Sequence, residues 1–292
     1  ARSRETDRLT ADLIVGADGR SSAARKALEK EDNLEVVSYM GALTLEGFDL
    51  PFEGFGHVIL GGPGPALMYR ISPNVVRVSL DVPLEANDLR RDDEALFEAF
   101  APVLPDWALP AIRQSIEEGS IQWAATCFRP HVEYGRKGIA LVGDAVGSYH
   151  PMTAVGMTSG FQDVACLVDS PDLDTYRQRR AQASHVPELL SSALYKVFQG
   201  EDDGAAPLRS AIYETWRADP DLCRRTMRLL SGAETRGTKF ASTFLRIALK
   251  AGFQLGHDAM RDRGALGLGE ATMTLAPWVR WPLAPLLPDQ LK

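Results

Sequence analysis

The sequence predicts an α/β (α+β) fold in three parts: an incomplete Rossmann-like domain, an inserted and mostly antiparallel β-sheet domain, and a helical C-terminal region. Two strand–turn–helix units, near residues 12–28 and 139–168, indicate the first part. Alternating apolar segments separated by Gly-Pro and Ser-Pro-Asn turns indicate the second, and apolar residues at helical spacing the third. We expect residues 1–35 and 130–170 to form the first domain, 36–129 the second and 171–292 the third.

Composition excludes several classes of protein. The chain has 292 residues, 45% of them hydrophobic and 24% charged, which is typical of a globular protein with about two domains. A net charge of -7 argues against a nucleic-acid binder, which needs clustered Lys and Arg. Cys127, Cys166 and Cys223 have neither CxxC nor Cys/His spacing, so no disulfide framework and no metal site is indicated. A reducing, cytoplasmic location is expected.

The first unit reads "LIVGADGRSSAARKAL". A short strand, Leu13–Val15, runs into a turn that contains Asp18 and Gly19, and Ser22 precedes a helix that contains Arg25. Such a turn gathers backbone N–H groups and a helix dipole at one point, where an anion can bind. A plain turn between a strand and a helix is the alternative.

The second unit repeats this geometry. The strand Ile139–Val142 is closed by Gly143, and Asp144 follows at its carboxyl end, where open α/β sheets bind ligands. A helix is expected to begin near Gly156 and to aim its free N–H groups at the ligand of Asp144. The pair suits a molecule with sugar-like hydroxyls and an electron-rich ring edge. A flavin has both features.

These residues carry a family resemblance. Asp18, Gly19, Ser22 and Arg25 resemble the DG motif of the para-hydroxybenzoate hydroxylase-like FAD-dependent monooxygenases. The later stretch resembles their GD motif through Gly143, Asp144, Ala145, His150, Pro151, Gly156 and Asp163. Within that superfamily, "HPMTAVGMT" and "GPALMYRISPNVVRVSLDVP" resemble segments of squalene epoxidases (squalene monooxygenases). The similarity covers residues 12 to about 255.

The resemblance implies an FAD/NAD(P)-binding domain and an FAD-dependent monooxygenase. It would transfer one oxygen atom of O2, through a flavin C4a-hydroperoxide, to a lipophilic alkene of triterpene or polyene type, with electrons from NADPH or a separate reductase. Asp144 would hold the ribityl hydroxyls, and the backbone at Gly156 and Met157 would face the N1 side of the ring. No catalytic residue or metal ligand is singled out. The expected cofactor-binding residues are Asp18, Gly19, Arg25, Gly143, Asp144, Pro151, Gly156 and Met157.

Two departures from the family keep alternatives open. The chain has no GxGxxG sequence, so we expect the N-terminal βαβ unit to be missing from it. Ala154 and Val155 stand where the family has glycines, which adds two Cβ atoms near the flavin. One alternative is a flavin-dependent reductase or desaturase of polyprenyl or carotenoid-like lipids. The other is a non-catalytic relative that binds lipid or acts as a scaffold.

The remaining segments give coarser predictions. "HVILGG", "ALMYRIS" and "VVRVSLDV" predict antiparallel strands, "DDEALFEAFAPVL" a helix, and "IQWAATCFRP" a strand that returns to the first sheet. Trp123 and Phe128 are expected to pack in the core, and contact with a substrate is the alternative. His150 is interpreted as a flavin-side or turn residue, and Asp163 as either a motif residue or a solvated or capping carboxylate.

Peripheral contact with the cytoplasmic membrane face is a further prediction. The tail places Trp278 and Trp281 beside Arg280, a pattern typical of membrane interfaces. A tail packed on the protein itself is the alternative. The resemblance favours the membrane, because squalene epoxidases use C-terminal helices to lie on it.

Overall fold

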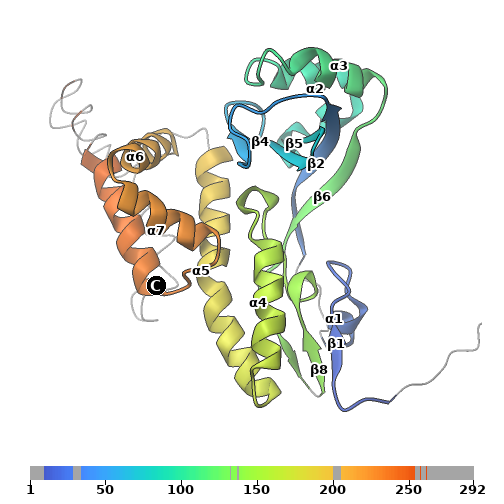
Figure 1. Ribbon diagram of the computed structural model, residues 1–292, viewed down its shortest axis with the longest axis vertical. Helices are drawn as coiled ribbons and strands as arrows, with labels where there is room; N and C mark the ends of the chain where they lie inside the picture. Colours follow the sequence, from blue (N-terminus) through green and yellow to red (C-terminus); the bar gives the residue numbers. More distant parts are fainter. Residues whose placement is uncertain are drawn as a thin grey trace, which may run out of the picture.

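The computed structural model describes residues 10–28, 34–131, 133–136, 138–199, 205–253, 257 and 261. A five-stranded sheet with two helices lies at one end of the molecule, and a small sheet with α1 and α4 lies at the other (Figure 1). The C-terminal helices stand to one side of both. The predicted α/β class, with an antiparallel sheet and a helical C-terminal part, is confirmed.

The small sheet brings the two strand–turn–helix units together. Strand β1 (Ile14–Gly16) is parallel to β8 (Ile139–Leu141), and β8 is antiparallel to β7 (Gly135–Arg136). Helix α1 (Ala23–Leu28) follows β1, and α4 (Gly156–Val168) begins at the glycine where a helix was expected. Because parallel strands end at the same edge, the turns that contain Asp18 and Asp144 emerge side by side.

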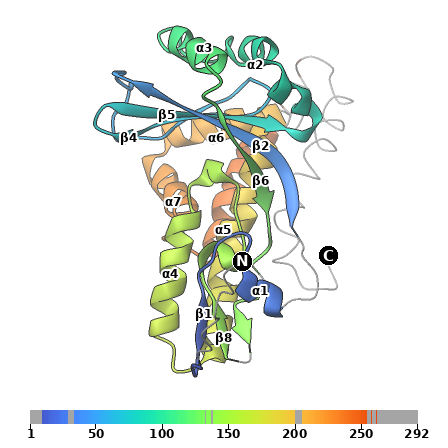
Figure 2. The same ribbon diagram turned by 90° about the vertical axis from the view of Figure 1, so that its right-hand side faces the viewer.

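The large sheet has the strand order β3-β4-β5-β2-β6, and every pairing in it is antiparallel. Its strands are β2 (Glu35–Glu46), β3 (His57–Ile59), β4 (Ala66–Ser72), β5 (Val75–Pro83) and β6 (Gln122–Phe128). Helices α2 (Asp93–Phe100) and α3 (Leu109–Glu117) cover one face, on the side away from α6 (Figure 2). A 3₁₀ segment, η1 (Leu84–Arg91), leads into α2.

Strand β5 shows how this sheet separates a core face from a site face. Val76, Val78, Leu80 and Val82 are buried in one cluster with residues of α2 and α3. The intervening side chains point the other way, because successive residues of a strand alternate between faces. Arg77 and Ser79 consequently line a cavity on the opposite face of the sheet from these helices.

Two predictions for this sheet were wrong or incomplete. Strand β6 does not return to the small sheet; it pairs with β2 along the large one, for example Met40 with Ala124. The partner strand, β2, was not predicted. Its polar and apolar residues do not alternate regularly, and neither do its buried and exposed positions. Gly41 allows close packing there, since a Cβ on it would lie 2.9 Å from the Trp123 ring. Trp123 packs against the core as expected but also lines the cavity described below, and Phe128 is half-buried and belongs to none of the core clusters of the described residues.

The predicted helical C-terminal region is confirmed over the described residues. It contains α5 (Leu173–Gln199), α6 (Ala205–Ala218), α7 (Pro220–Leu230) and a helical segment over 237–253. Helix α5 runs alongside α4 and connects the two ends of the molecule (Figure 1). None of the described helices combines the length and apolarity needed to cross a membrane. Trp278, Arg280 and Trp281 lie outside the described residues.

Candidate functional site

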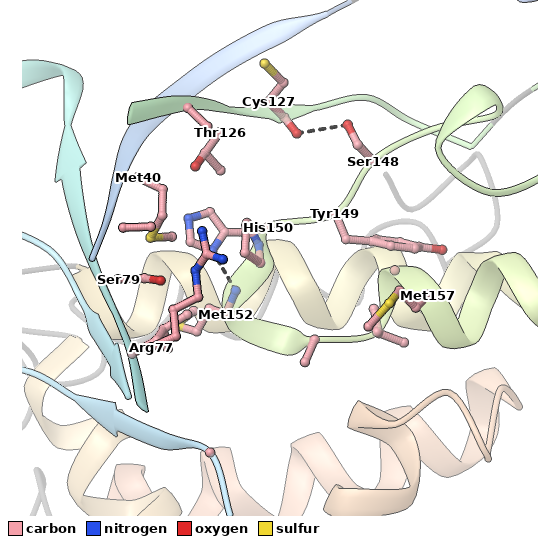
Figure 3. Close-up of a pocket in the computed structure, with 18 of the residues that line it drawn as sticks. Met40, Arg77, Ser79, Thr126, Cys127, Ser148, Tyr149, His150, Met152 and Met157 are labelled. Atoms are coloured by element: carbon pink, nitrogen blue, oxygen red, sulfur yellow. Dashed lines mark hydrogen bonds between the residues drawn. The ribbon is translucent and has the colours of Figure 1, made fainter. Parts of the chain in front are cut away.

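A cavity of about 1040 Å³ separates the large sheet from the loop that follows β8. Side chains of β2, β4, β5 and β6 form one wall, and the segment from Asp144 to Met157 forms the other (Figure 3). Met40, Leu67 and Trp123 contribute apolar surface. The cavity thus joins the site face of the antiparallel sheet to the second strand–turn–helix unit.

Asp144 and the start of α4 converge at this cavity. Asp144 is exposed on the short 3₁₀ turn η2 (Gly143–Ala145), and its Oδ1 lies 4.0 Å from where a Cβ on Gly156 would be. Helix α4 begins at Gly156 with no side-chain cap, so the first N–H groups have no partner within the helix. An acceptor carboxylate and a group of backbone donors therefore face the same space.

A buried ion pair fixes the turn that carries Asp144. Gly143 has a φ of 60°, and its N–H donates to Asp163 Oδ2 at 2.8 Å. Arg180 Nε donates to Asp163 Oδ1 at 2.6 Å. Burial raises the pKa of the Asp163 carboxyl, while Arg180 and the Gly143 N–H oppose that shift. Interpretation of Asp163 as a solvated or capping carboxylate was wrong, because α4 packs on η2 and α5 and leaves it 0% exposed.

Asp18 is engaged within its own turn. Its carboxylate accepts from the Ser22 hydroxyl at 2.5 Å and from the N–H groups of Ala23 and Ala24 at 2.7 and 3.2 Å. The Ser22 hydrogen bond, followed by the two N–H groups, lowers the pKa of Asp18. Gly19 supplies the positive φ of the turn, 73°. Asp18 therefore caps α1 in this structure, and neither it nor Gly19 lines the cavity.

Arg25 links the turn that contains Asp18 to the turn that contains Asp144. Its side chain is buried, with Nη1 donating to the Ala145 carbonyl at 2.9 Å and Nη2 donating to the Arg20 carbonyl at 2.7 Å. It does not line the cavity. The predicted cofactor-binding residues thus separate into two groups. Asp144, Pro151, Gly156 and Met157 line the cavity, whereas Asp18, Gly19, Arg25 and Gly143 shape the turns behind it.

The loop before α4 accommodates Ala154 and Val155, the two residues that stand where the family has glycines. Ala154 closes the 3₁₀ turn η3 (Pro151–Thr153) with a φ of 51°, in the left-handed region where glycine is common. Val155 is 2% exposed, and its Cγ2 lies 3.3 Å from where a Cβ on Gly232 would be. The backbone therefore keeps a glycine-like path at Ala154, and the bulk of Val155 packs toward the helical region.

Several site residues were missed by sequence reasoning. Arg77 and Ser79 line the cavity from β5, and Asp81 is buried on the same strand. Their signal is the alternation of polar residues with Val and Leu in "VVRVSLDV". That alternation predicts a two-faced strand, but only the partner strands and the loop decide which face lines a cavity.

Comparison with known proteins decides the family. The family model described as squalene epoxidase matches residues 10–273. The chain belongs to the squalene epoxidase family. Its similarity to this family includes 30% identity to squalene epoxidase ERG1 of Candida albicans, over 76% of this chain and 49% of the relative. Squalene epoxidase 3 of Arabidopsis thaliana is 31% identical, over 82% and 49% of the two chains.

Other matches agree and define the extent of the likeness. Squalene monooxygenase of Rattus norvegicus is 29% identical over 72% of this chain and 39% of the relative. This member of the squalene epoxidase family spans about half the length of the curated relatives it matches. Among solved structures, HpxO of Klebsiella pneumoniae, complexed with FAD and uric acid, has a TM-score of 0.60 and 20% identity over 75% of this chain and 60% of its own.

A second solved structure gives the same fold. PqsL of Pseudomonas aeruginosa, described as a probable FAD-dependent monooxygenase, has a TM-score of 0.54 and 22% identity over 64% of this chain and 56% of its own. At these identities the likeness establishes the fold, that of the FAD-dependent monooxygenases, and leaves activity to be argued from the site. The expected resemblance to squalene epoxidases is confirmed.

Proposed function

We propose that this chain supplies the substrate-binding and flavin-ring side of an FAD-dependent monooxygenase, which inserts one oxygen atom of O2 into a lipophilic alkene. The observation that carries the proposal is the meeting of Asp144 with the uncapped start of α4 at one edge of the cavity. Membership of the squalene epoxidase family supports an oxidoreductase of this kind.

The residues present fit FAD. The exposed carboxylate of Asp144 suits the hydroxyls of a ribityl chain, as acceptor to donor. The free N–H groups at Gly156 and Met157, with the positive end of the α4 dipole, suit the electron-rich edge of a flavin ring. FAD, when bound, supplies the activation of O2. Gly143, Asp163 and Arg180 hold the turn that presents Asp144, and Arg25 anchors the neighbouring turn to it.

The cavity suits an apolar substrate. Its volume, about 1040 Å³, lies at the upper end of the range of ligand pockets, and Met40, Leu67 and Trp123 offer apolar contact. With a substrate bound between them, such walls would exclude water from the place where oxygen is transferred. We propose a triterpene- or polyene-like alkene as the substrate class. The chain's own residues would bind and orient it against the loop from Pro151 to Gly156.

The exposed apolar surface of α4 and β1 indicates that a further structural unit covers it. Met157, Phe161, Val164 and Val168 follow one another along α4 at helical spacing and are 80%, 75%, 47% and 79% exposed. The apolar residues of β1 are also exposed, although strands of parallel sheets are usually buried. We propose that a βαβ unit carrying GxGxxG covers this surface and completes the FAD site. It would pair with the edge of β1 that has no partner strand among the described residues.

The electron source and the location are separate proposals. NADPH, directly or through a reductase, would reduce the flavin. We also propose peripheral attachment to the cytoplasmic face of a membrane. Leu245, Leu249 and Phe253, spaced by four residues on the helical segment, are 45%, 54% and 80% exposed, which supports such a contact.

Oxygen consumption tests the reaction type. The chain would be joined to an N-terminal βαβ unit that carries GxGxxG, loaded with FAD, reduced and mixed with O2 and squalene. We expect substrate-dependent oxygen uptake and an epoxide product. Bound FAD with a reduced or desaturated lipid and no oxygen incorporation would establish the reductase or desaturase instead. No FAD binding and no product would favour a non-catalytic relative.

A further inference from the structure

One buried contact joins the large sheet to the loop between η2 and α4. Asp81, on β5, is 0% exposed, and His150, immediately before Pro151, is 4% exposed. Their facing atoms, Asp81 Oδ2 and His150 Nε2, lie 3.6 Å apart. Within the described part of the chain neither atom has a hydrogen-bond partner at standard distance. A buried carboxylate oxygen and a buried ring nitrogen are therefore left facing one another.

The remaining polar atoms of Asp81 are engaged. Oδ1 accepts from the Ser38 hydroxyl at 2.5 Å, and the Asp81 N–H donates to the Pro65 carbonyl at 3.1 Å. Gly64 is required beside it, because a Cβ at that position would lie 2.3 Å from the Asp81 carbonyl oxygen. The Ser38 hydroxyl of β2 thus holds the carboxylate, and the segment just before β4 holds the backbone of Asp81, with Oδ2 facing His150.

The His150 ring is fixed as firmly. Nδ1 accepts from the Met152 N–H at 3.2 Å, a contact drawn in Figure 3, and the ring stacks on Tyr195 of α5 with centroids 4.1 Å apart. Since Nδ1 accepts a hydrogen bond, it carries no proton. A neutral imidazole then has its proton on Nε2, the atom that faces the Asp81 carboxylate. The geometry of both ring nitrogens is consistent with this one tautomer.

We propose that Asp81 is a positioning residue that acts through His150. Asp81 selects the Nε2–H tautomer of His150. Nδ1 then carries no proton and accepts the hydrogen bond from the Met152 N–H. This hydrogen bond fixes the turn from Pro151 to Ala154, which precedes Gly156. The loop that faces the flavin is thereby tied to β5, the strand whose Arg77 and Ser79 line the cavity. The functional part of this inference rests on the proposed monooxygenase, whereas the tautomer does not.

The tautomer can be measured on the chain itself. The protein has five histidines, so ¹⁵N-histidine labelling and long-range ¹H–¹⁵N correlation would resolve each ring. His150→Gln assigns the His150 signals by their loss. We expect a protonated Nε2 and an unprotonated Nδ1 for His150. In Asp81→Ala the signals should shift toward a mixture of tautomers. A protonated Nδ1 in the unaltered chain, or an unchanged tautomer in Asp81→Ala, would overturn the proposal.

A matched variant separates this effect from general loosening. Ser38→Ala removes the hydrogen bond to the other oxygen of the same carboxylate and leaves the contact with His150 in place. We expect Ser38→Ala to keep the Nε2–H tautomer. Dispersed amide spectra of both variants would establish that they are folded. A tautomer change as large in Ser38→Ala as in Asp81→Ala would reduce Asp81 to a structural role.

The functional consequence has its own readout. In the FAD-loaded fusion, with flavin reduced chemically, Asp81→Ala should lower the epoxide formed per flavin reoxidised by about 10-fold, because a small misplacement of reacting groups costs rate. Affinity for FAD should change little, since Asp144 and the start of α4 are untouched. Failure of the unaltered fusion to bind FAD would contradict the proposed function and leave the NMR result standing. Unchanged coupling in Asp81→Ala would refute the positioning role.

Discussion

Asp163 and Arg180 form a buried ion pair, 2.6 Å between Oδ1 and Nε, and the other oxygen of Asp163 accepts from the N–H of Gly143. Arg180 belongs to α5, Asp163 to α4, and Gly143 to the turn that presents Asp144. The turn η2 and the helices α4 and α5, which follow one another along the chain, therefore meet beneath one carboxylate of the site. Its orientation depends on this pair, although neither partner lines the cavity.

Asp163→Asn should destabilise the protein by about 3 kcal/mol, because it leaves the Arg180 guanidinium buried without its counter-charge. Chemical denaturation would measure the loss of unfolding free energy. Asp174→Asn is the control, since Asp174 pairs with Arg177 at 3.1 Å on the surface. The control should cost less than about 1 kcal/mol. Equal effects of the two substitutions would show that the buried pair does not hold the turn.

Ala154→Gly should stabilise the protein by about 1 kcal/mol, because a Cβ in the left-handed region is strained and glycine is not. Ala154 is exposed, so little packing is lost. Ala181→Gly, on an exposed position of α5, should act in the opposite direction by about 1 kcal/mol. The midpoints of thermal unfolding would give both signs. A destabilised Ala154→Gly would contradict the backbone described for this loop.

Arg25→Leu should disconnect α1 from the turn that contains Ala145. The substitution keeps much of the apolar stem but removes two hydrogen bonds to carbonyls, each worth about 1.5 kcal/mol or more when the donor is charged. Hydrogen exchange should accelerate in residues 19–28 and 143–146. Lys26→Leu, at the exposed neighbouring position, should leave exchange there unchanged. Protection that persists in Arg25→Leu would assign the link to other contacts.

Asp18 should make stability depend on acid pH. Its pKa is lowered in the folded state, chiefly by the Ser22 hydroxyl, so its contribution is fully present above the unfolded pKa of about 3.9. The contribution is lost as the pH falls through the lower folded value. The stability difference between the unaltered chain and Asp18→Asn should therefore shrink on acidification, with a modest amplitude because Asp18 is exposed. A difference independent of pH would exclude this role.

Much of the architecture could be predicted from local patterns. The glycine turns at Asp18 and Asp144 and the start of α4 at Gly156 were correct, because strand, turn and helix signals there lie within a few residues of one another. Strand β6 was assigned to the wrong sheet, since strand pairing depends on β2, which is about 80 residues away and irregular in pattern. Local sequence does not encode such a pairing.

The site was predictable to a lesser extent. Asp144 and Gly156, to which a motif and a physical need both pointed, line the cavity, and their contact with a cofactor stays a prediction. The burial of Asp163 could not be predicted, because its partner Arg180 lies on the next helix and no spacing rule connects them. The position of Asp81 in the site could not be predicted either. A single acidic residue in an apolar strand gives no such signal, and its contact with the His150 ring is visible only in the structure.

The central claim is that Asp144 and the start of α4 form part of an FAD site. It is tested most directly by titrating FAD into the chain fused to the GxGxxG-bearing unit, with Asp144→Ala and Asp169→Ala as the paired variants. Asp169 is an exposed carboxylate at the opposite end of α4 and serves as the control. We predict tight flavin binding by the fusion and by Asp169→Ala, and a loss of at least about 10-fold in affinity for Asp144→Ala, as expected for one charge-assisted hydrogen bond. Equal affinity in all three proteins, or none in any of them, would contradict the account.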